Sequence, residues 1–356
     1  MQRYGAGINK QLLSFIDNLK AITQKQIDSL SGKTINPSLT LARYTKLKDN
    51  ITTLSTALRA DMISNIKGDL SNLAIYEADF TKRLLDQASN LRKVGFETVV
   101  PTVKQLQASA FASILDGKIP NANANGDGLT VQKALDTYGR QATSEVLQTI
   151  RVGYAAGNTI AEMRKDIMST LFPELDSKQN RNKASALART ITNHVSASAR
   201  DEFYQSNDDI ITGYQVVATL DDRTTLTCAA LDGQVFDKDD FEKPPYHWNC
   251  RTTFIGVVDK KYTIQLADQG RVAKGDDGPE TVSTKSNYNE FLSQQSSAFQ
   301  DDVLGPERGA LYRAGLDDVT HFVDENYHPI NLDELKTKDN EHVFEKARKD
   351  IGYEIG

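Results

Sequence analysis

Three residues in the second half of the chain have the types and spacing of metal ligands. His247 and Cys250 are three positions apart, so a tight turn can present a ring nitrogen and a sulfur to one point. Cys228 precedes them by about twenty residues and can supply a third donor atom. We call residues 219–258 the knuckle, because the spacing predicts a loop that leaves a strand and returns on this turn.

The chemistry of this cluster has three interpretations. A structural zinc needs four protein ligands, so here Asp222, Asp232 or a water molecule would have to complete the shell. Two reduced thiols could instead pack inside a hairpin, with His247 hydrogen-bonded to an oxygen. A disulfide between the two cysteines is the third possibility. The spacing alone leaves all three open.

Arg223 and Asp232 are candidates for holding the knuckle in shape. Arg223 lies beside a predicted strand edge, and Asp232 lies in a Leu-Asp-Gly turn. An arginine can bridge a carboxylate through two parallel hydrogen bonds, which favours a structural role for both residues. We therefore expect Arg223→Ala to lower the melting temperature by several degrees.

The elements that must position these residues are mostly helical. Apolar residues recur at steps of three and four over residues 8–30, 44–58 and 70–94, which predicts three helices packed as a bundle or on a partner. Further helices are predicted over 131–146, after a Thr159–Glu162 capping box, and over 183–205. The period then changes, and residues 213–220, 234–236 and 252–258 predict a small antiparallel sheet.

The predicted fold class is α+β and predominantly helical, with a long N-terminal helical bundle followed by a helical domain that carries a small antiparallel sheet and the Cys/His knuckle. The predicted boundaries are a helical arm over 1–118, a linker over 119–128, a domain over 129–258, a polar linker over 259–286 and a tail over 287–356.

Composition and charge narrow the function classes. The sequence has no run of eighteen apolar residues and no charged-then-apolar leader, which predicts neither a membrane span nor a secretory signal. Two cysteines cannot build a disulfide framework and suit synthesis in a reducing cytoplasm. The net charge is +6 in residues 1–120, +3 in 121–200 and −15 in 201–356. This charge gradient has two interpretations. The basic N-terminal helices could lie near nucleic acid or an acidic partner, or the charged residues could simply cover solvent-exposed surfaces.

Catalytic motifs are absent from the sequence. It contains no nucleophile elbow G-x-S-x-G, no phosphate-binding G-x-x-x-x-G-K and no H-E-x-x-H. Metal-assisted hydrolysis would need an open metal position and a base, which an incomplete ligand set could provide. The prediction is nevertheless a protein without enzymatic activity.

The knuckle and its flanks resemble the phage head morphogenesis family, the Mu protein F-like minor head proteins. Three ordered segments carry the resemblance: T-x-D-x-R-T, C-x-x-L-D-G and P-P-x-H-x-N-C-R. The matching residues are Thr219, Asp221 or Asp222, Arg223, Thr224, Cys228, Leu231, Asp232, Gly233, Pro244, Pro245, His247, Asn249, Cys250 and Arg251. An A-R-T-x-T segment at Ala188, Arg189, Thr190 and Thr192 also matches, with Ile191 where the family has glutamate.

The resemblance extends into the tail and departs from the family at two cysteines. Phe291, Val303 and Arg308 are among the matching tail residues, and the likeness covers roughly residues 150–335. Thr225 and Thr252 stand where the family's other two cysteines fall. The resemblance thus implies a metal site of which Cys228, His247 and Cys250 remain.

The resemblance also implies a function. It predicts a minor head protein of a tailed phage, made in the host cytoplasm and located in the virion near the portal vertex. Such a protein would act in head assembly and in DNA packaging, retention or ejection. Its expected partners are the portal protein, the major capsid or scaffolding protein and phage DNA. The alternative is a metal-dependent nuclease or an ADP-ribosyltransferase-like effector that carries the same domain.

Overall fold

The computed structural model describes residues 2–31, 38–92, 96–115, 128–262, 270–337 and 340–352, without the side chains of residues 31 and 88–92. They form two compact units. The first comprises Met1–Thr81, Val100–Glu202 and His247–Asn249, and the second comprises Lys82–Val99, Phe203–Tyr246 and Cys250–Gly356. The linker predicted over 119–128 lies, except for Gly128, outside the described residues.

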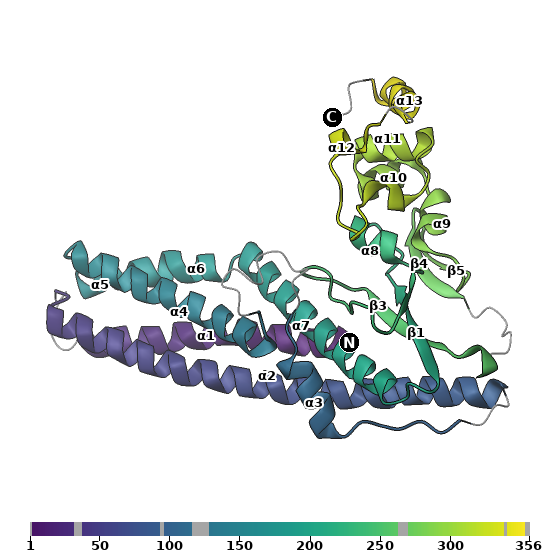
Figure 1. The fold of residues 1–356 in the computed structure, drawn as a ribbon. Coiled ribbons are helices and arrows are strands. Elements are labelled where there is room, and N and C mark those ends of the chain that lie inside the picture. The colour runs from purple at the N-terminus through teal and green to yellow at the C-terminus, as the bar shows by residue number, and fades with distance from the viewer. Residues whose placement is uncertain are drawn as a thin grey trace. The chain divides into compact units, whose positions relative to one another are not determined.

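Helices build the first unit (Figure 1). Residues 129–202 belong with the N-terminal helices, although the predicted boundaries place them in one domain with the strands. The helices are α1 (Gln2–Ser31), α2 (Leu41–Arg92), α3 (Val103–Ala112), α4 (Val131–Ala155), α5 (Ile160–Asp166), the π-helix η1 (Ile167–Leu171), α6 (Phe172–Leu175) and α7 (Lys178–Gln205), of which α2 and α7 continue into the second unit.

The second and third predicted helices are one helix. The apolar pattern predicts one helix that ends near residue 58 and another that begins near residue 70, whereas α2 runs without a break from Leu41 to Arg92. The intervening residues include no proline, and an added Cβ at Gly68 would meet nothing within 4 Å, so this position is open. A lone exposed glycine costs a helix only about 1 kcal/mol, which does not end it.

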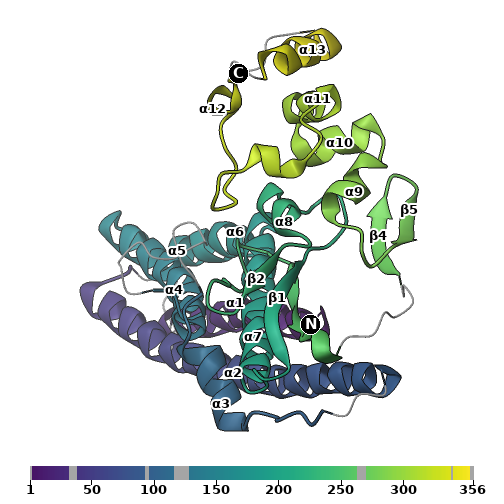
Figure 2. The ribbon, with the colours of Figure 1, turned by 45° about the vertical axis from the view of Figure 1, so that its right-hand side comes forward.

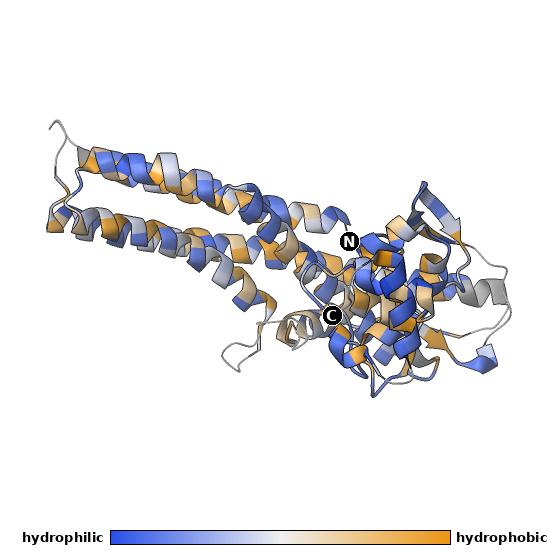
Figure 3. Cartoon of the chain, turned by 90° about the horizontal axis from the view of Figure 1, so that it is seen from above, coloured by the Kyte–Doolittle hydropathy of each residue, from blue (hydrophilic) through white to orange (hydrophobic). Residues whose placement is uncertain are grey.

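Apolar stripes hold the first unit together. In Figure 3 the long helices carry apolar and polar bands side by side, as expected of helices that bury one face. Ile8, Leu12 and Leu19 of α1 are fully buried. Tyr138 of α4 donates a hydrogen bond to the carbonyl of Leu12 (3.2 Å), and burial raises the pKa of Tyr138 to about 12.

Side-chain caps fix the helix starts. Thr159 accepts a hydrogen bond from the backbone N–H of Glu162, whose carboxylate accepts one from the backbone N–H of Thr159, which confirms the predicted capping box. Thr102 and Gln105 form the same arrangement at the start of α3. No helix in the described part of the chain is long and apolar enough to cross a membrane.

A three-stranded antiparallel sheet lies in the second unit, with strand order β2–β1–β3. The strands are β1 (Ile211–Val217), β2 (Val235–Asp237) and β3 (Thr253–Val258), close to the three predicted strands. Tyr214 of β1 pairs with Phe236 on one side and Gly256 on the other. The predicted α+β class, mostly helical with a small antiparallel sheet, is confirmed.

A second, two-stranded sheet occupies the segment predicted as a polar linker. β4 (Arg271–Gly275) and β5 (Gly278–Val282) pair antiparallel and lie side by side in Figure 2. Ala273 is buried, although its strand neighbours Val272 and Lys274 are exposed. Because this hairpin is polar and its only buried residues are the small Ala273 and Gly275, its sequence resembles a linker.

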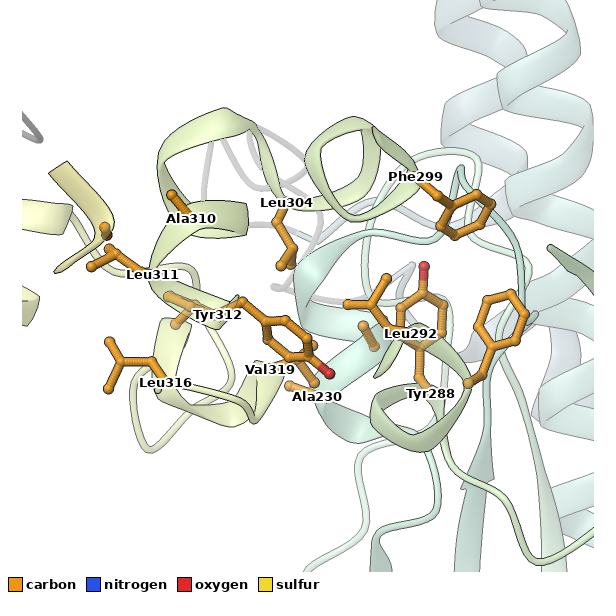
Figure 4. Packing of buried hydrophobic residues seen from close by; sticks show 14 of the residues in the cluster. Ala230, Tyr288, Leu292, Phe299, Leu304, Ala310, Leu311, Tyr312, Leu316 and Val319 are labelled. Atoms are coloured by element: carbon orange, nitrogen blue, oxygen red, sulfur yellow. The ribbon is translucent and has the colours of Figure 1, made fainter. Parts of the chain in front are cut away.

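The C-terminal helices enclose an apolar core that includes Tyr288, Phe291, Leu311 and Phe322 (Figure 4). This core also takes in Leu220 and Ala230 from the knuckle. The remaining helices of the second unit are α8 (Leu226–Leu231), η2 (Lys260–Tyr262), α9 (Tyr288–Ser293), α10 (Ser297–Leu304), α11 (Pro306–Ala314), η3 (Val319–Phe322), α12 (Leu332–Leu335) and α13 (Glu341–Ile351).

Candidate metal centre

Cys228 is presented by the short helix α8. Thr225 caps this helix, and its side chain accepts a hydrogen bond from the backbone N–H of Cys228. The cysteine is 2% exposed. Thr225 is the residue that stands in place of one of the family's cysteines, so here a hydroxyl that starts the helix replaces a thiol.

Cys250 follows a turn whose backbone is unusual at two places. The Pro244–Pro245 peptide bond is cis, and Asn249 has a φ of 66°. Cys250 is fully buried, and its Sγ lies 3.8 Å from Sγ of Cys228. A disulfide bond would bring the sulfurs to about 2.05 Å, so the structure contains two thiols.

His247 completes a group of three potential ligands. One ring nitrogen of His247 and the two sulfurs all lie within 4.8 Å of one another. Nδ1 of His247 is 2.8 Å from the carbonyl oxygen of Trp248. A carbonyl only accepts, so Nδ1 carries the proton and the lone pair is on Nε2. Metal-binding histidines are commonly oriented by such a hydrogen bond from the other ring nitrogen.

The sulfur separation fits a tetrahedral metal. Two sulfurs that each lie about 2.3 Å from a tetrahedral zinc are roughly 3.8 Å from each other. Cys228 and Cys250 have this separation. The residues present therefore fit zinc, with two sulfurs and one imidazole as donors.

The expected fourth ligand, Asp222 or Asp232, is not found with the other three. Within the described residues the group contains Cys228, His247 and Cys250 alone. Asp222 is exposed. Asp232 is fully buried and engaged in an ion pair with Arg271. A zinc ion here would have three protein ligands and would need a water molecule or another ligand in the fourth position.

The protonation of the thiols follows from their surroundings. The hydrogen bond with Cys250 raises the pKa of Cys228 well above its ordinary value, and burial raises it further. Without a metal the thiol therefore keeps its proton. Because zinc binds thiolates, metal binding at this site would release protons.

Arg251 rather than Arg223 braces the first acidic residue of the knuckle. The two guanidinium nitrogens of Arg251 donate to both carboxylate oxygens of Asp221, at 2.5 and 2.7 Å. Burial alone would raise the pKa of Asp221, but the hydrogen bonds and charge of Arg251 outweigh it and lower the pKa. The backbone carbonyl of Asp221 also accepts a hydrogen bond from the Tyr288 hydroxyl (2.7 Å).

Arg271 braces the second acidic residue. It donates to both carboxylate oxygens of Asp232, at 2.7 and 2.9 Å, and also to the carbonyls of Ala218 and Ser286. Asp232 in turn accepts a hydrogen bond from the backbone N–H of Ala218 (2.6 Å). The guanidinium of Arg271 in β4 thus joins three segments: the Leu-Asp-Gly turn, the end of β1 and the start of α9. It reaches α9 through Ser286, which precedes the helix cap Asn287.

The structure does not form a bridge between Arg223 and Asp232, because Asp232 pairs with Arg271. The Arg223 side chain is 69% exposed and lies 3.6 Å from Asp221. Arg271 is not predictable as the partner of Asp232, because it lies 39 positions after it, in a segment predicted as a linker. The only signal for Arg271 in the sequence is a basic residue in a segment where apolar and polar residues alternate.

The A-R-T and P-P-x-H-x-N-C-R segments contact each other in the first unit. Arg189 of α7 donates to the side-chain oxygen of Asn249 (2.5 Å), and the backbone N–H of Asn249 donates to the Thr190 hydroxyl (2.8 Å). Asn tolerates the left-handed backbone found at position 249 better than most residues. Arg189 therefore anchors the turn that carries His247, and no carboxylate at position 191 is involved.

Gly233 has a positive φ of 82°, and its backbone N–H donates to the carbonyl of Val216 (2.9 Å). A residue with a side chain is disfavoured in this conformation, which accounts for glycine at the end of the Leu-Asp-Gly turn.

Comparison with known proteins identifies the middle of the chain. Residues 144–255 match the family described as phage Mu protein F like protein. No curated protein and no solved structure shows a significant match. The matched residues contain α7, β1, α8 and the candidate metal ligands, so the predicted resemblance is confirmed. Residues 144–255 are thus similar to the phage Mu protein F like family.

Proposed function

We propose that this protein is a minor head protein of a tailed phage that associates with the portal vertex and acts in DNA packaging, retention or ejection. The observation that carries the proposal is the family match over residues 144–255. Its support in the structure is that the resembling segments contact one another, through Arg189 and Asn249 and through Cys228 and Cys250. The residues that resemble the family are therefore those that build one local structure.

The long helices are the proposed docking element. Residues 1–120 have a net charge of +6, whereas residues 201–356 have a net charge of −15. The knuckle is braced by two bidentate ion pairs and serves as a rigid mount. The proposed partners are the portal protein and, at the same vertex, the major capsid or scaffolding protein and phage DNA.

Quantitative peptide mass spectrometry on purified particles tests this function. Procapsids, DNA-filled heads and emptied heads are compared, with the portal protein as internal standard. A fixed, low ratio to portal in all three is expected of a structural component of the vertex. Presence in filled heads and loss from emptied ones would identify a protein ejected with the genome. Absence from every particle would overturn the proposal.

We further propose that Cys228, His247 and Cys250 hold a zinc ion. Bound zinc would crosslink α8 to the turn at residues 247–250 and would supply structural stability. Metal analysis of the full chain after dialysis should find about one equivalent of zinc, and Cys228→Ser should lose it. Less than about a tenth of an equivalent in the unaltered protein would contradict the site.

The alternative of a metal-dependent nuclease rests on the open fourth position of this ligand set. Hydrolysis also needs a base near the metal. Asp221 and Asp232, the buried carboxylates of the knuckle, are both engaged by arginines. We therefore favour a structural site. Incubation with plasmid DNA, with and without divalent metal ions, separates the two: metal-dependent cleavage that Cys228→Ser abolishes would support the enzyme. An ADP-ribosyltransferase-like activity has no supporting feature in the described residues.

A further inference from the structure

The two thiols of the knuckle lie next to each other. Cys228 lies on α8 and Cys250 precedes β3, and their Sγ atoms are 3.8 Å apart, close to van der Waals contact for two sulfurs. Both residues belong to the second unit, so this contact lies within one unit. They are the only cysteines of the sequence, so each has no other cysteine of the chain to pair with.

A disulfide bond can close from this position with a small movement. It brings two sulfurs to about 2.05 Å, so each Sγ moves by roughly 0.9 Å when both move equally. A side chain that turns by about 30° about its Cα–Cβ bond carries its sulfur this far, which is a modest departure from a staggered rotamer.

Contacts that do not involve the sulfurs hold the two segments in place. α8 ends at Asp232, whose carboxylate is paired with Arg271. Cys250 is followed by Arg251, which donates two hydrogen bonds to Asp221. The fold therefore keeps the thiols together without a bond between them, which raises the effective concentration of one thiol at the other.

We propose that Cys228 and Cys250 are a reversible dithiol–disulfide pair that closes when the phage head leaves the reducing cytoplasm. This rests on the proposed function, which carries the protein out of the cell in the virion, and it assigns a regulation to the same site. The reduced pair is the form that can hold zinc, because zinc binds thiolates. The closed pair joins α8 covalently to the residues before β3. It restricts the unfolded chain and so stabilises the second unit.

The oxidant is a low-molecular-weight disulfide, the class of reagent that oxidised glutathione represents. One cysteine thiolate attacks a sulfur of this reagent, forms a mixed disulfide and releases one small thiol. The other cysteine thiolate attacks the mixed disulfide, forms the bond between Cys228 and Cys250 and releases the second small thiol. The cysteines lose two protons and two electrons, which the reagent takes up as it becomes two thiols.

Burial of the thiols affects the rate of this exchange and leaves its equilibrium unchanged. Cys228 is 2% exposed and Cys250 is fully buried, so the reagent reaches them when the structure opens locally. α8 has only six residues, and short elements of this kind open at a lower cost than the whole domain.

A redox titration of the full chain tests the proposal. The protein is freed of metal with a chelator, equilibrated with mixtures of reduced and oxidised glutathione, quenched with acid and analysed by mass spectrometry. Closure should appear as the loss of two hydrogens from the monomer, with the two cysteine peptides joined, and dithiothreitol should reverse it. In urea the same titration gives the closure constant of the unfolded chain. The folded protein should exceed this constant by about tenfold or more, because the fold holds the sulfurs together. An equal or smaller constant in the folded protein, or a stable mixed disulfide with glutathione, would overturn the proposal.

A displaced thiol is the matched control. The double variant Cys228→Ser, Thr227→Cys keeps one thiol on α8 but turns it by about 100° around the helix. Its closure constant should be no larger in the folded protein than in urea. If the displaced pair gained as much from folding as the natural pair does, the contact between the Sγ atoms of Cys228 and Cys250 would not be what favours the bond, and the proposal would fail.

Alkylation in phage particles separates this inference from the proposed function. Heads from inside the cell and heads released from it are denatured in iodoacetamide without a reductant, and the cysteine peptides are identified by mass spectrometry. Both cysteines should be alkylated in the intracellular heads, whereas in the released heads they should be joined to each other until dithiothreitol is added. If the protein is absent from all heads, the proposed function fails. If it is present and both cysteines are alkylated in the released heads, only the dithiol–disulfide inference fails.

Discussion

The two units of the chain are stabilised by different interactions. In the first unit, long helices satisfy their own backbone hydrogen bonds and pack through apolar stripes such as that of Ile8, Leu12 and Leu19. In the second unit, short strands and turns are joined by charged side chains, above all Arg251 and Arg271. Irregular backbone leaves polar groups that side chains must satisfy when they are buried.

The two units also differ in how many segments a single charged side chain joins. In the first unit, Asp136 of α4 joins Arg140, one turn away, to Arg59 of α2. In the second unit, Arg271 alone holds Asp232 and the carbonyls of Ala218 and Ser286. Removing one guanidinium therefore affects several segments in the second unit, whereas each apolar contact in the first is one of many.

Arg271→Leu should have the largest effect. It leaves the fully buried carboxylate of Asp232 without its counter-charge, which costs about 3–5 kcal/mol of unfolding free energy. Urea unfolding followed by near-ultraviolet circular dichroism, which reports on the packing of aromatic residues such as the buried Tyr288 of the second unit, measures it. The matched control is Arg223→Ala, which should change stability by less than about 0.5 kcal/mol. If Arg271→Leu and Arg223→Ala lowered the unfolding free energy equally, the bridge between Arg271 and Asp232 would not be a major source of stability in the second unit.

Leu12→Ala should come next, at about 3 kcal/mol, because it opens a cavity in the buried stripe of α1. Urea unfolding followed by circular dichroism reports on the helices. Leu54→Ala is the control, since Leu54 is 39% exposed and loses little buried surface. If Leu12→Ala lowered the unfolding free energy more than Arg271→Leu does, the apolar contacts of the first unit would be more critical than the charged bridges of the second.

Thr159→Ala should destabilise the first unit by about 1 kcal/mol through loss of the cap of α5. Thr159→Ser keeps the hydroxyl and should restore most of this stability. Thermal unfolding by circular dichroism compares the three proteins. Identical curves for Thr159→Ala and the unaltered chain would show that the cap is not needed once α5 is packed.

The smallest effect should be a pH dependence of the second unit. The pKa of Asp221 is lowered in the folded protein, so its contribution is present above the ordinary aspartate value of about 3.9 and is lost as the pH falls through the lowered value. We expect a loss below about 1 kcal/mol between pH 5 and pH 3, from urea unfolding at each pH. Asp221→Asn should lack this component, and an unchanged slope in that variant would assign it to other carboxylates.

Much of this architecture follows from local patterns in the sequence. The apolar steps of α1 and the alternating residues of β1 and β3 predict these elements because each buries one face. The His247–Cys250 spacing brings two of the candidate ligands together on one turn, and Cys228 joins them as predicted.

What the sequence did not predict depends on contacts between distant residues. Arg271 finds Asp232 only through the fold of the β4–β5 hairpin, and nothing in a polar stretch distinguishes a buried arginine from a solvated one. The single helix α2 was missed for a different reason. Met62 and Ile66 continue the steps of four from Leu58 to Leu70, and no residue between them ends a helix, so the two predicted helices belong to one continuous apolar pattern.

The partner of Asp232 lies outside the segment that defines the family. The family match ends at residue 255, and Arg271 is sixteen positions further on. A gene fragment that ended with the match would encode Asp232 without the arginine that neutralises it. The segment needed for a stable fold is therefore longer than the recognisable one, and a fragment that ends at residue 255 should be less stable than one that extends through β4.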